Sequence, residues 1–362
     1  MEVRIIRFDL NTLLIPAARS LAADRQEAAG GPVHPLRTAL LACRIAPLVC
    51  LPEPDTAGVV SAALLLDNGV GPDAPPGSGA HCRVGEQNVR ALLPPAAAQA
   101  LLYHHENYDA SGLFGLRGQE IPIASQILRL ADRIGRHMSL GSGYRQESVR
   151  EDAIRHVKAF TGSLYSPEVS DAFLHLAQRS SFWYEAADSV AETALRMRLP
   201  RSGAERTYRE IRRATRILMA IGHPSVQERG KAQPFLTDRL AKLAAYCRIS
   251  EDLSQQMLIA ADLLALLPSP VCTEGLRGIE GFENIVRWME NASVGGMGAG
   301  LDLPARLLST LRAYHSLRKS RSGREPLSHA GALAVLRSEG CADPDVVDAI
   351  ERCCRLEESL AG

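Results

Sequence analysis

The chain has 362 residues, a length that suits two domains of ordinary size better than one hydrophobic core. Its 41 Lys and Arg residues balance 41 Asp and Glu residues, so a chain-wide basic field for nucleic acid is excluded. No apolar run reaches the roughly 18–20 residues that span a bilayer, and no signal-like segment is found near the N-terminus. The eight cysteines lack C-x-x-C spacing, which favours a reduced, cytoplasmic location and cysteines that serve as small packing residues.

Apolar residues recur with helical spacing along nearly the whole chain. The pattern predicts helices within 34–49, 56–67, 85–93, 123–138 and 168–180. Clusters of Gly and Pro at 30–32, 71–79, 110–118 and 295–300 separate such segments. Long runs of alternating apolar and polar residues, which would indicate strands, are missing. We therefore predict an all-α protein.

The order of the segments in the first half of the chain is repeated in the second half. "SAALLLDNG" followed by "LLYHHENYDASG" and "IPIASQILRLA" corresponds to "QQMLIAADLLALLP" followed by "IVRWMENASVGG" and "LDLPARLLSTL". This correspondence predicts two homologous helical domains, 1–200 and 223–362, joined by a basic connector helix at 201–222. The alternative is that unrelated helical proteins look alike at this level.

Four histidines and two aspartates are candidates for a metal site. His34, His81, His104 and His105 flank predicted helices, and imidazole and carboxylate are the ligands that divalent transition metals favour. Asp67 and Asp132 follow apolar stretches, where a carboxylate is costly unless a cation neutralises it. A bridging carboxylate can hold two ions for attack on a phosphodiester.

Each of these residues also has an ordinary structural interpretation. A single histidine is more often a surface or core residue than a ligand, and we interpret His137, His156 and His175 in that way. For Asp132, the alternative to metal binding is an ion pair with Arg133 or Arg136.

The segment "HHENYDASGLFGLRGQEIPIASQILRLAD" at 104–132 resembles the HD-GYP group of HD-superfamily phosphohydrolases. "HPLRTALLA", "ALLLDNGVG", "HCRVG" and "YSPEVSDAFLHLA" resemble other segments of that family in the same order. The resemblance implies two tandem HD-type helical domains, of which the second is a degenerate copy. It also implies hydrolysis of cyclic di-GMP, a bacterial signalling nucleotide, at a centre of two or three metal ions, usually iron or manganese.

The resemblance also implies a set of ligands. One ion would be bound by Asp67, His81, His104 and His105, and a second by His34, Asp67 and Asp132. The family's remaining ligand to the second ion is a histidine, and Leu66 stands in its place. Gly30 stands where members with three metals have a carboxylate, so one or two ions are expected. Asp67, His104 and Asp132 would carry the catalytic roles.

The resemblance further implies that Ser111, Phe114 and Arg145 contact the substrate. Val70 replaces the family's phosphate-binding lysine, and Leu113 replaces its tyrosine. In the second half every ligand position has changed. Those positions hold Leu236, Leu264, Ala265, Trp288, Met289 and Arg312.

Two functions follow as hypotheses. The first is a metal-dependent phosphohydrolase of weak or altered activity, confined to the first domain. The alternative is an inactive protein that binds a cyclic dinucleotide or a metal and signals through protein partners, for which the second domain or a homodimer would provide the surface. Nucleic-acid binding by the basic helix at 205–217 is disfavoured because acidic residues interrupt the arginines.

Overall fold

The computed structural model describes residues 4–24, 33–139, 146–222, 234–267, 273–295, 300–319, 325–338 and 342–361. The described chain divides into two compact units. We call residues 9–204 the first unit, and residues 1–8 together with 205–362 the second unit. The first eight residues therefore belong with the second half of the chain, although the sequence pattern assigned them to the first domain.

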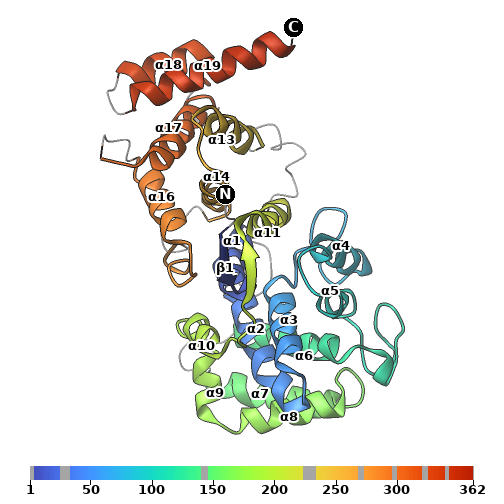
Figure 1. The fold of residues 1–362 in the computed structure, drawn as a ribbon. Helices are drawn as coiled ribbons and strands as arrows, with labels where there is room; N and C mark the ends of the chain where they lie inside the picture. Colours follow the sequence, from blue (N-terminus) through green and yellow to red (C-terminus); the bar gives the residue numbers. More distant parts are fainter. Residues whose placement is uncertain are drawn as a thin grey trace. The chain divides into compact units, whose positions relative to one another are not determined.

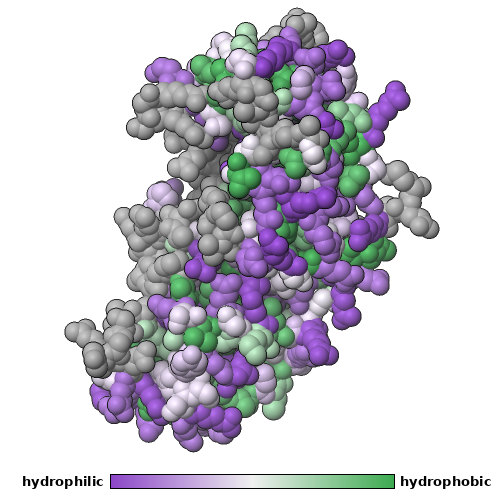
Figure 2. Space-filling model, turned by 90° about the vertical axis from the view of Figure 1, so that its left-hand side faces the viewer, coloured by the Kyte–Doolittle hydropathy of each residue, from purple (hydrophilic) through white to green (hydrophobic). Residues whose placement is uncertain are grey.

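The fold is all-α, as the sequence predicted (Figure 1). The described strands, β1 and β2, are only four residues each and form one small sheet. Among the described residues, no helix is both long and apolar enough to cross a membrane. The face drawn in Figure 2 is mostly hydrophilic, and its hydrophobic residues form small separate groups.

Helix α2 forms the centre of the first unit and packs against α3, α6 and α10. It starts at His34, with a proline in its first turn, and nearly all of its side chains are buried. A buried central helix explains why its sequence is apolar around most of its circumference. The elements of this unit are α1 (Leu10–Asp24), α2 (His34–Ile45), η1 (Ala46–Val49), α3 (Glu53–Leu64), α4 (Gly79–Val89), α5 (Pro95–Leu102), η2 (Gly118–Glu120), α6 (Ile123–Ser139), α7 (Gln146–Phe160), α8 (Pro167–Ala177), α9 (Ser180–Glu185) and α10 (Ala191–Arg198).

Helix α14 has the corresponding central place in the second unit and packs against α11, α13 and α16. The basic segment predicted as a connector forms α11, whose apolar face packs on α14, so this helix is part of the core of the second unit. That the two units are copies of one fold stays a prediction. The elements of this unit are β1 (Ile5–Phe8), β2 (Ala204–Thr207), α11 (Tyr208–Gly222), α13 (Pro234–Tyr246), α14 (Glu251–Leu266), α16 (Glu283–Ser293), α17 (Leu303–Leu317), α18 (His329–Ser338) and α19 (Pro344–Ala361).

Candidate metal centre

Three predicted histidine ligands come together in the first unit. His81 lies in the first turn of α4, where the Ser78 hydroxyl caps the helix by accepting a hydrogen bond from the His81 amide at 3.3 Å. His104 and His105 follow the end of α5 in a turn. The Nε2 atoms of His81 and His104 are 3.4 Å apart, and the His105 ring lies 5.0 Å from that of His81. With the neighbouring Cys82, these residues form the group that we call the histidine cluster.

A close contact between backbones places the turn after α3 against this cluster. A Cβ atom on Gly69 would overlap the carbonyl oxygen of His81 and the amide nitrogen of Gly85. Only glycine allows this approach. The turn that carries Asp67 is thereby fixed against α4.

The three imidazoles are neutral at physiological pH. Burial lowers the pKa of His81, His104 and His105, and in His81 and His105 the repulsion from a protonated His104 lowers it further. The Nδ1 atom of His104 donates to the Leu101 carbonyl at 2.6 Å, so its Nε2 atom carries a lone pair. The buried Nδ1 atom of His81 has no hydrogen-bond partner among the described residues. The cluster is thus rich in uncharged nitrogen donors.

This donor set fits a divalent transition metal. Two imidazole nitrogens that each lie about 2.1 Å from one ion are about 3.0–3.4 Å from each other. The 3.4 Å between the Nε2 atoms of His81 and His104 agrees with that spacing. One potential ligand atom from each of His81, Cys82, His104 and His105 lies within 4.8 Å of the others.

Cys82 was not among the predicted ligands, because the cysteines were interpreted as packing residues. Its Sγ atom lies 3.7 Å from the Nε2 atom of His81, and its side chain is buried. Burial, with a smaller contribution from Asp67, raises the pKa of this thiol to about 12. The thiol is therefore protonated unless a cation replaces its proton. Adjacent side chains on a helix point about 100° apart, so the position of Cys82 next to His81 in the sequence did not predict this contact.

The other predicted ligands form a second group, which we call the carboxylate group: His34, Asp67 and Asp132. Asp132 lies on α6 and accepts a hydrogen bond of 2.9 Å from the Nε2 atom of His34 at the start of α2. Both of its oxygens also accept from the Nε atom of Arg136, at 3.1 and 3.2 Å. Arg136 reaches Asp67 as well, with 3.3 Å between Nη2 and Oδ2. Arg136 thus bridges the two carboxylates.

The bridge explains how these buried charges are tolerated. Burial alone would raise the pKa of Asp132, but the hydrogen bond from His34 and the charge of Arg136 hold it below its usual range. Burial would lower the pKa of Arg136, but Asp132 and Asp67 raise it above its usual value. Asp67 lies outside the compact set of ligand atoms in the histidine cluster. The ion pair of Asp132 that was the alternative to metal binding is therefore formed, and its partner is Arg136.

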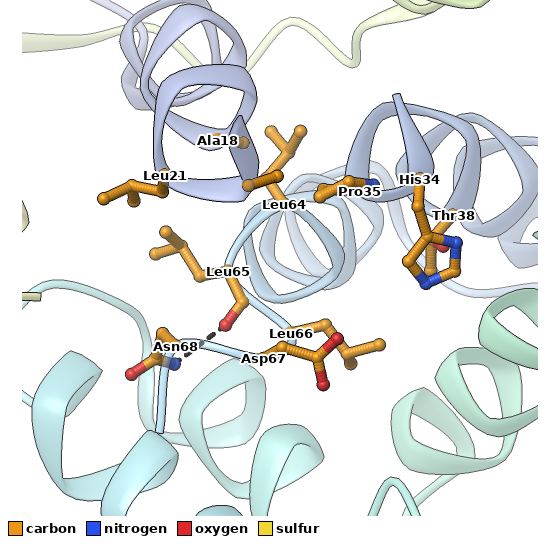
Figure 3. A pocket seen from close by; sticks show the side chains of 11 residues that line it. Ala18, Leu21, His34, Pro35, Thr38, Leu64, Leu65, Leu66, Asp67 and Asn68 are labelled. Carbon is orange, nitrogen blue, oxygen red and sulfur yellow. Dashed lines mark hydrogen bonds between the residues drawn. The ribbon is translucent and has the colours of Figure 1, made fainter. Parts of the chain in front are cut away.

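A small cavity of about 40 Å³ lies beside the carboxylate group (Figure 3). Its walls include His34 and Asp67, together with apolar side chains such as Leu21 and Leu64. Leu66, which stands at the position of a missing ligand, also lines this cavity and is buried. A hydrocarbon side chain offers no lone pair, so Leu66 cannot be a ligand, and the set of ligands for a second ion beside Asp67 stays incomplete.

The loop after His105 is organised by Glu106. This buried carboxylate accepts hydrogen bonds of 2.7 Å from the backbone amides of Phe114 and Leu116. The Phe114 ring lies under the Arg83 guanidinium at 4.9 Å. Ser111 is exposed in this loop, and its hydroxyl accepts from Asn107 at 3.0 Å.

The loop therefore holds two of the predicted substrate contacts, Ser111 and Phe114, near α4. The third, Arg145, lies outside the described residues, as does Gly30.

In the second unit, three of the positions that correspond to ligands in the sequence comparison are occupied by buried residues. Trp288 and Met289 are buried on α16, and the Trp288 indole donates to Asp302 at 3.0 Å. Leu264 is buried on α14. In the described part of this unit, no cluster of three or more potential metal ligands is found.

Part of the chain is similar to known proteins. Residues 89–169 match the HD domain family, and this range includes His104 and His105 but not His81 and Cys82. A segment of 80 residues is 41% identical to a cyclic di-GMP phosphodiesterase of Thermotoga maritima. This segment covers 22% of the chain and 22% of that relative.

A solved structure of a cyclic GMP-AMP-specific phosphodiesterase from V. cholerae has the same fold. It matches with a TM-score of 0.66 at 17% identity, over 98% of this chain and 99% of that one. Residues 89–169 therefore form part of an HD domain, and the resemblance to HD-superfamily phosphohydrolases seen in the sequence is confirmed.

Proposed function

We propose that the first unit is a metal-dependent phosphohydrolase that cleaves a phosphodiester bond of a cyclic dinucleotide. The observation that carries this proposal is the convergence of His81, His104 and His105, whose neutral imidazoles gather beside the Glu106 loop. Iron or manganese is the proposed metal. The names of the two relatives support cyclic di-GMP or cyclic GMP-AMP as the class of substrate.

Different side chains would bind the metal, order the loop and contact the substrate. His81, His104 and His105 would hold the ion. A divalent ion in such a site supplies Lewis acidity for a phosphoryl oxygen and a nucleophile at neutral pH. The Glu106 carboxylate holds the loop with Phe114, an aromatic ring suited to stacking on a base. The exposed Arg83 lies over that ring and offers positive charge to a phosphate.

The test is hydrolysis by the whole chain, purified without oxygen and loaded with iron or manganese. Cyclic di-GMP and cyclic GMP-AMP are incubated separately, and products are separated by chromatography. We expect cleavage that stops when a chelator removes the metal and returns when the metal is restored. A loaded protein that leaves both nucleotides intact would refute the catalytic proposal.

One observation favours the alternative, a protein that binds a nucleotide or a metal without cleaving it. Arg136 already neutralises the carboxylates that would share a second ion, and the family's hydrolysis is associated with two or three ions. Such a protein would signal through a protein partner bound by the second unit, or through a homodimer. Calorimetry distinguishes the two: binding of a cyclic dinucleotide without turnover supports the alternative, whereas turnover rejects it.

A further inference from the structure

The carboxylate group has a resident cation. The Arg136 guanidinium contacts Asp132 through Nε and Asp67 through Nη2, so it lies between two carboxylates that are far apart in the sequence. A guanidinium is planar and always charged, and it presents several N–H donors in fixed directions. It therefore satisfies two carboxylates at once, which is also what a bridging metal ion does.

The position of Arg136 is fixed by its surroundings. The buried Arg37 on α2 donates to the carbonyl of Gly135 at 2.9 Å and so holds the turn of α6 that carries Arg136. Helices α2 and α6 approach closely here, because a Cβ on Gly135 would lie 3.0 Å from the Thr38 hydroxyl and 3.2 Å from the Nδ1 atom of His34. The guanidinium is thus positioned by the packing of α2 against α6.

The same place does not fit a second metal ion. Leu66 provides no lone pair, and His34 already hydrogen-bonds to Asp132. An ion would have to displace the Arg136 guanidinium from the carboxylate oxygens of Asp67 and Asp132. The guanidinium is part of the same chain, so it cannot diffuse away. An attached competitor has a high effective concentration, so a free ion is at a disadvantage.

We infer that Arg136 takes the place of the second metal ion, so that the first unit binds a single divalent ion in its histidine cluster. The inference rests on the proposed function only for the ion in the histidine cluster. The carboxylate group is a permanently occupied cation site, and its occupant is a side chain.

Metal counting tests the inference without an activity assay. The whole chain is saturated with manganese(II) and freed of excess, and its metal is measured by elemental analysis and electron paramagnetic resonance. The wild-type protein should hold about one ion per chain with the spectrum of an isolated ion. The double variant Leu66→His with Arg136→Ala should hold about two, with the altered spectrum of a coupled pair.

A matched variant, Leu66→His with Arg133→Ala, removes an exposed arginine of the same helix and should hold about one ion. A wild-type chain with two ions overturns the inference, and so does a folded double variant that binds no more ions than the wild-type chain. If the wild-type chain binds no ion, the proposed function fails. A gain of one ion in the double variant would then still support the role of Arg136, and no gain would overturn it.

A second pair of variants serves if Leu66→His with Arg136→Ala does not fold. Leu66→His with Arg136→Met restores the ligand, removes the charge and keeps most of the volume of the arginine. Manganese should then raise the melting temperature in two saturable phases, against one phase in the wild-type chain and in Leu66→His with Arg133→Met. A single phase in the folded Leu66→His, Arg136→Met variant overturns the inference.

Discussion

The histidine cluster offers three neutral imidazoles whose lone pairs are available for a cation, whereas the carboxylate group has two carboxylates that Arg136 already bridges. Both groups lie in the first unit, and both belong to one metal centre in the family that the sequence resembles. Their difference teaches that the two halves of such a centre can change separately. One half keeps its donors, and the other replaces an exchangeable cation with a fixed one.

The largest expected effect comes from the half that keeps its donors. His104→Ala removes the nitrogen that faces His81 at 3.4 Å, so the remaining ligands should no longer retain a metal. Hydrolysis should fall at least about 100-fold, since the ion supplies most of the stabilisation of the transition state. Metal analysis and turnover measured on the same sample check this prediction.

The matched control for that variant is His175→Ala, which changes an exposed histidine of α8. It should keep metal and turnover. Full metal content in His104→Ala would mean that the histidine cluster is not the metal site and would indicate binding by the carboxylate group.

A second variant distinguishes the role of the histidines in metal binding from the role of Glu106 in ordering the loop after His105. Glu106→Gln leaves one oxygen acceptor where the carboxylate now accepts from the amides of Phe114 and Leu116. Loss of a charge-assisted hydrogen bond in a buried position costs about 2–3 kcal/mol of loop stability. Hydrogen exchange at these two amides should accelerate and KM should rise, while metal content stays the same.

Glu120→Gln is the comparison for Glu106→Gln, because Glu120 is an exposed carboxylate that accepts from the Arg117 amide in the same loop. Glu120→Gln should have little effect on hydrogen exchange at the Phe114 and Leu116 amides and on KM. Equal effects of the two substitutions would mean that the burial of Glu106 has no special role.

Helical periodicity was sufficient to predict the all-α fold, because buried faces repeat with the period of the helix. The sequence motif also named the three histidines that the structure brings together. The partner of Asp132 was left open between Arg133 and Arg136. Arg136 lies four residues from Asp132 and shares its face of α6, whereas Arg133 is exposed. This part of the site could have been predicted from helix geometry alone.

Other parts depend on tertiary packing. Neighbouring residues on a helix point in directions about 100° apart, so sequence could not tell that Cys82 and His81 both face His104. The contact of Arg136 with Asp67 joins residues that are distant in sequence. No local pattern encodes such a contact, because it depends on how the turn after α3 packs beside α6.

A buried aspartate in the second unit shows what a carboxylate does without such a bridge. Asp262 on α14 has its Oδ2 atom 2.9 Å from the Thr215 hydroxyl, and burial raises its pKa from 3.8 to about 6. The folded state therefore holds this proton more tightly than the unfolded state. At pH 8 the ionised group costs up to about 3 kcal/mol, and the cost disappears as the pH falls through 6 toward 4.

Asp262→Asn should remove that pH dependence and raise the stability of the second unit at pH 8. Urea unfolding of the whole chain between pH 5 and 8 checks this result. Asp132 should behave in the opposite way, because its pKa is lowered: its contribution to stability is present above pH 4 and is lost in acid. Asp238→Asn, an exposed change, is the control. An unchanged slope in Asp262→Asn would mean that the buried carboxyl is not the titrating group.

The smallest expected effect concerns the fourth member of the histidine cluster. The Cys82 thiol, with a pKa of about 12, can become a ligand only if an ion displaces its proton. A soft thiolate favours zinc, whereas manganese prefers nitrogen and oxygen. Cys82→Ser should therefore weaken zinc binding roughly tenfold and leave manganese binding nearly unchanged.

Competition with a chromophoric chelator measures both affinities, and Cys43→Ser, a change at another buried thiol on α2, should alter neither. Equal losses for zinc and manganese would make Cys82 a ligand for any ion. Unchanged zinc affinity would remove it from the set of ligands. If Cys82 is a ligand for zinc alone, manganese is bound by the three histidines. The histidine cluster then differs from the carboxylate group because its imidazole nitrogens bind the ion, whereas Arg136 bridges the carboxylates.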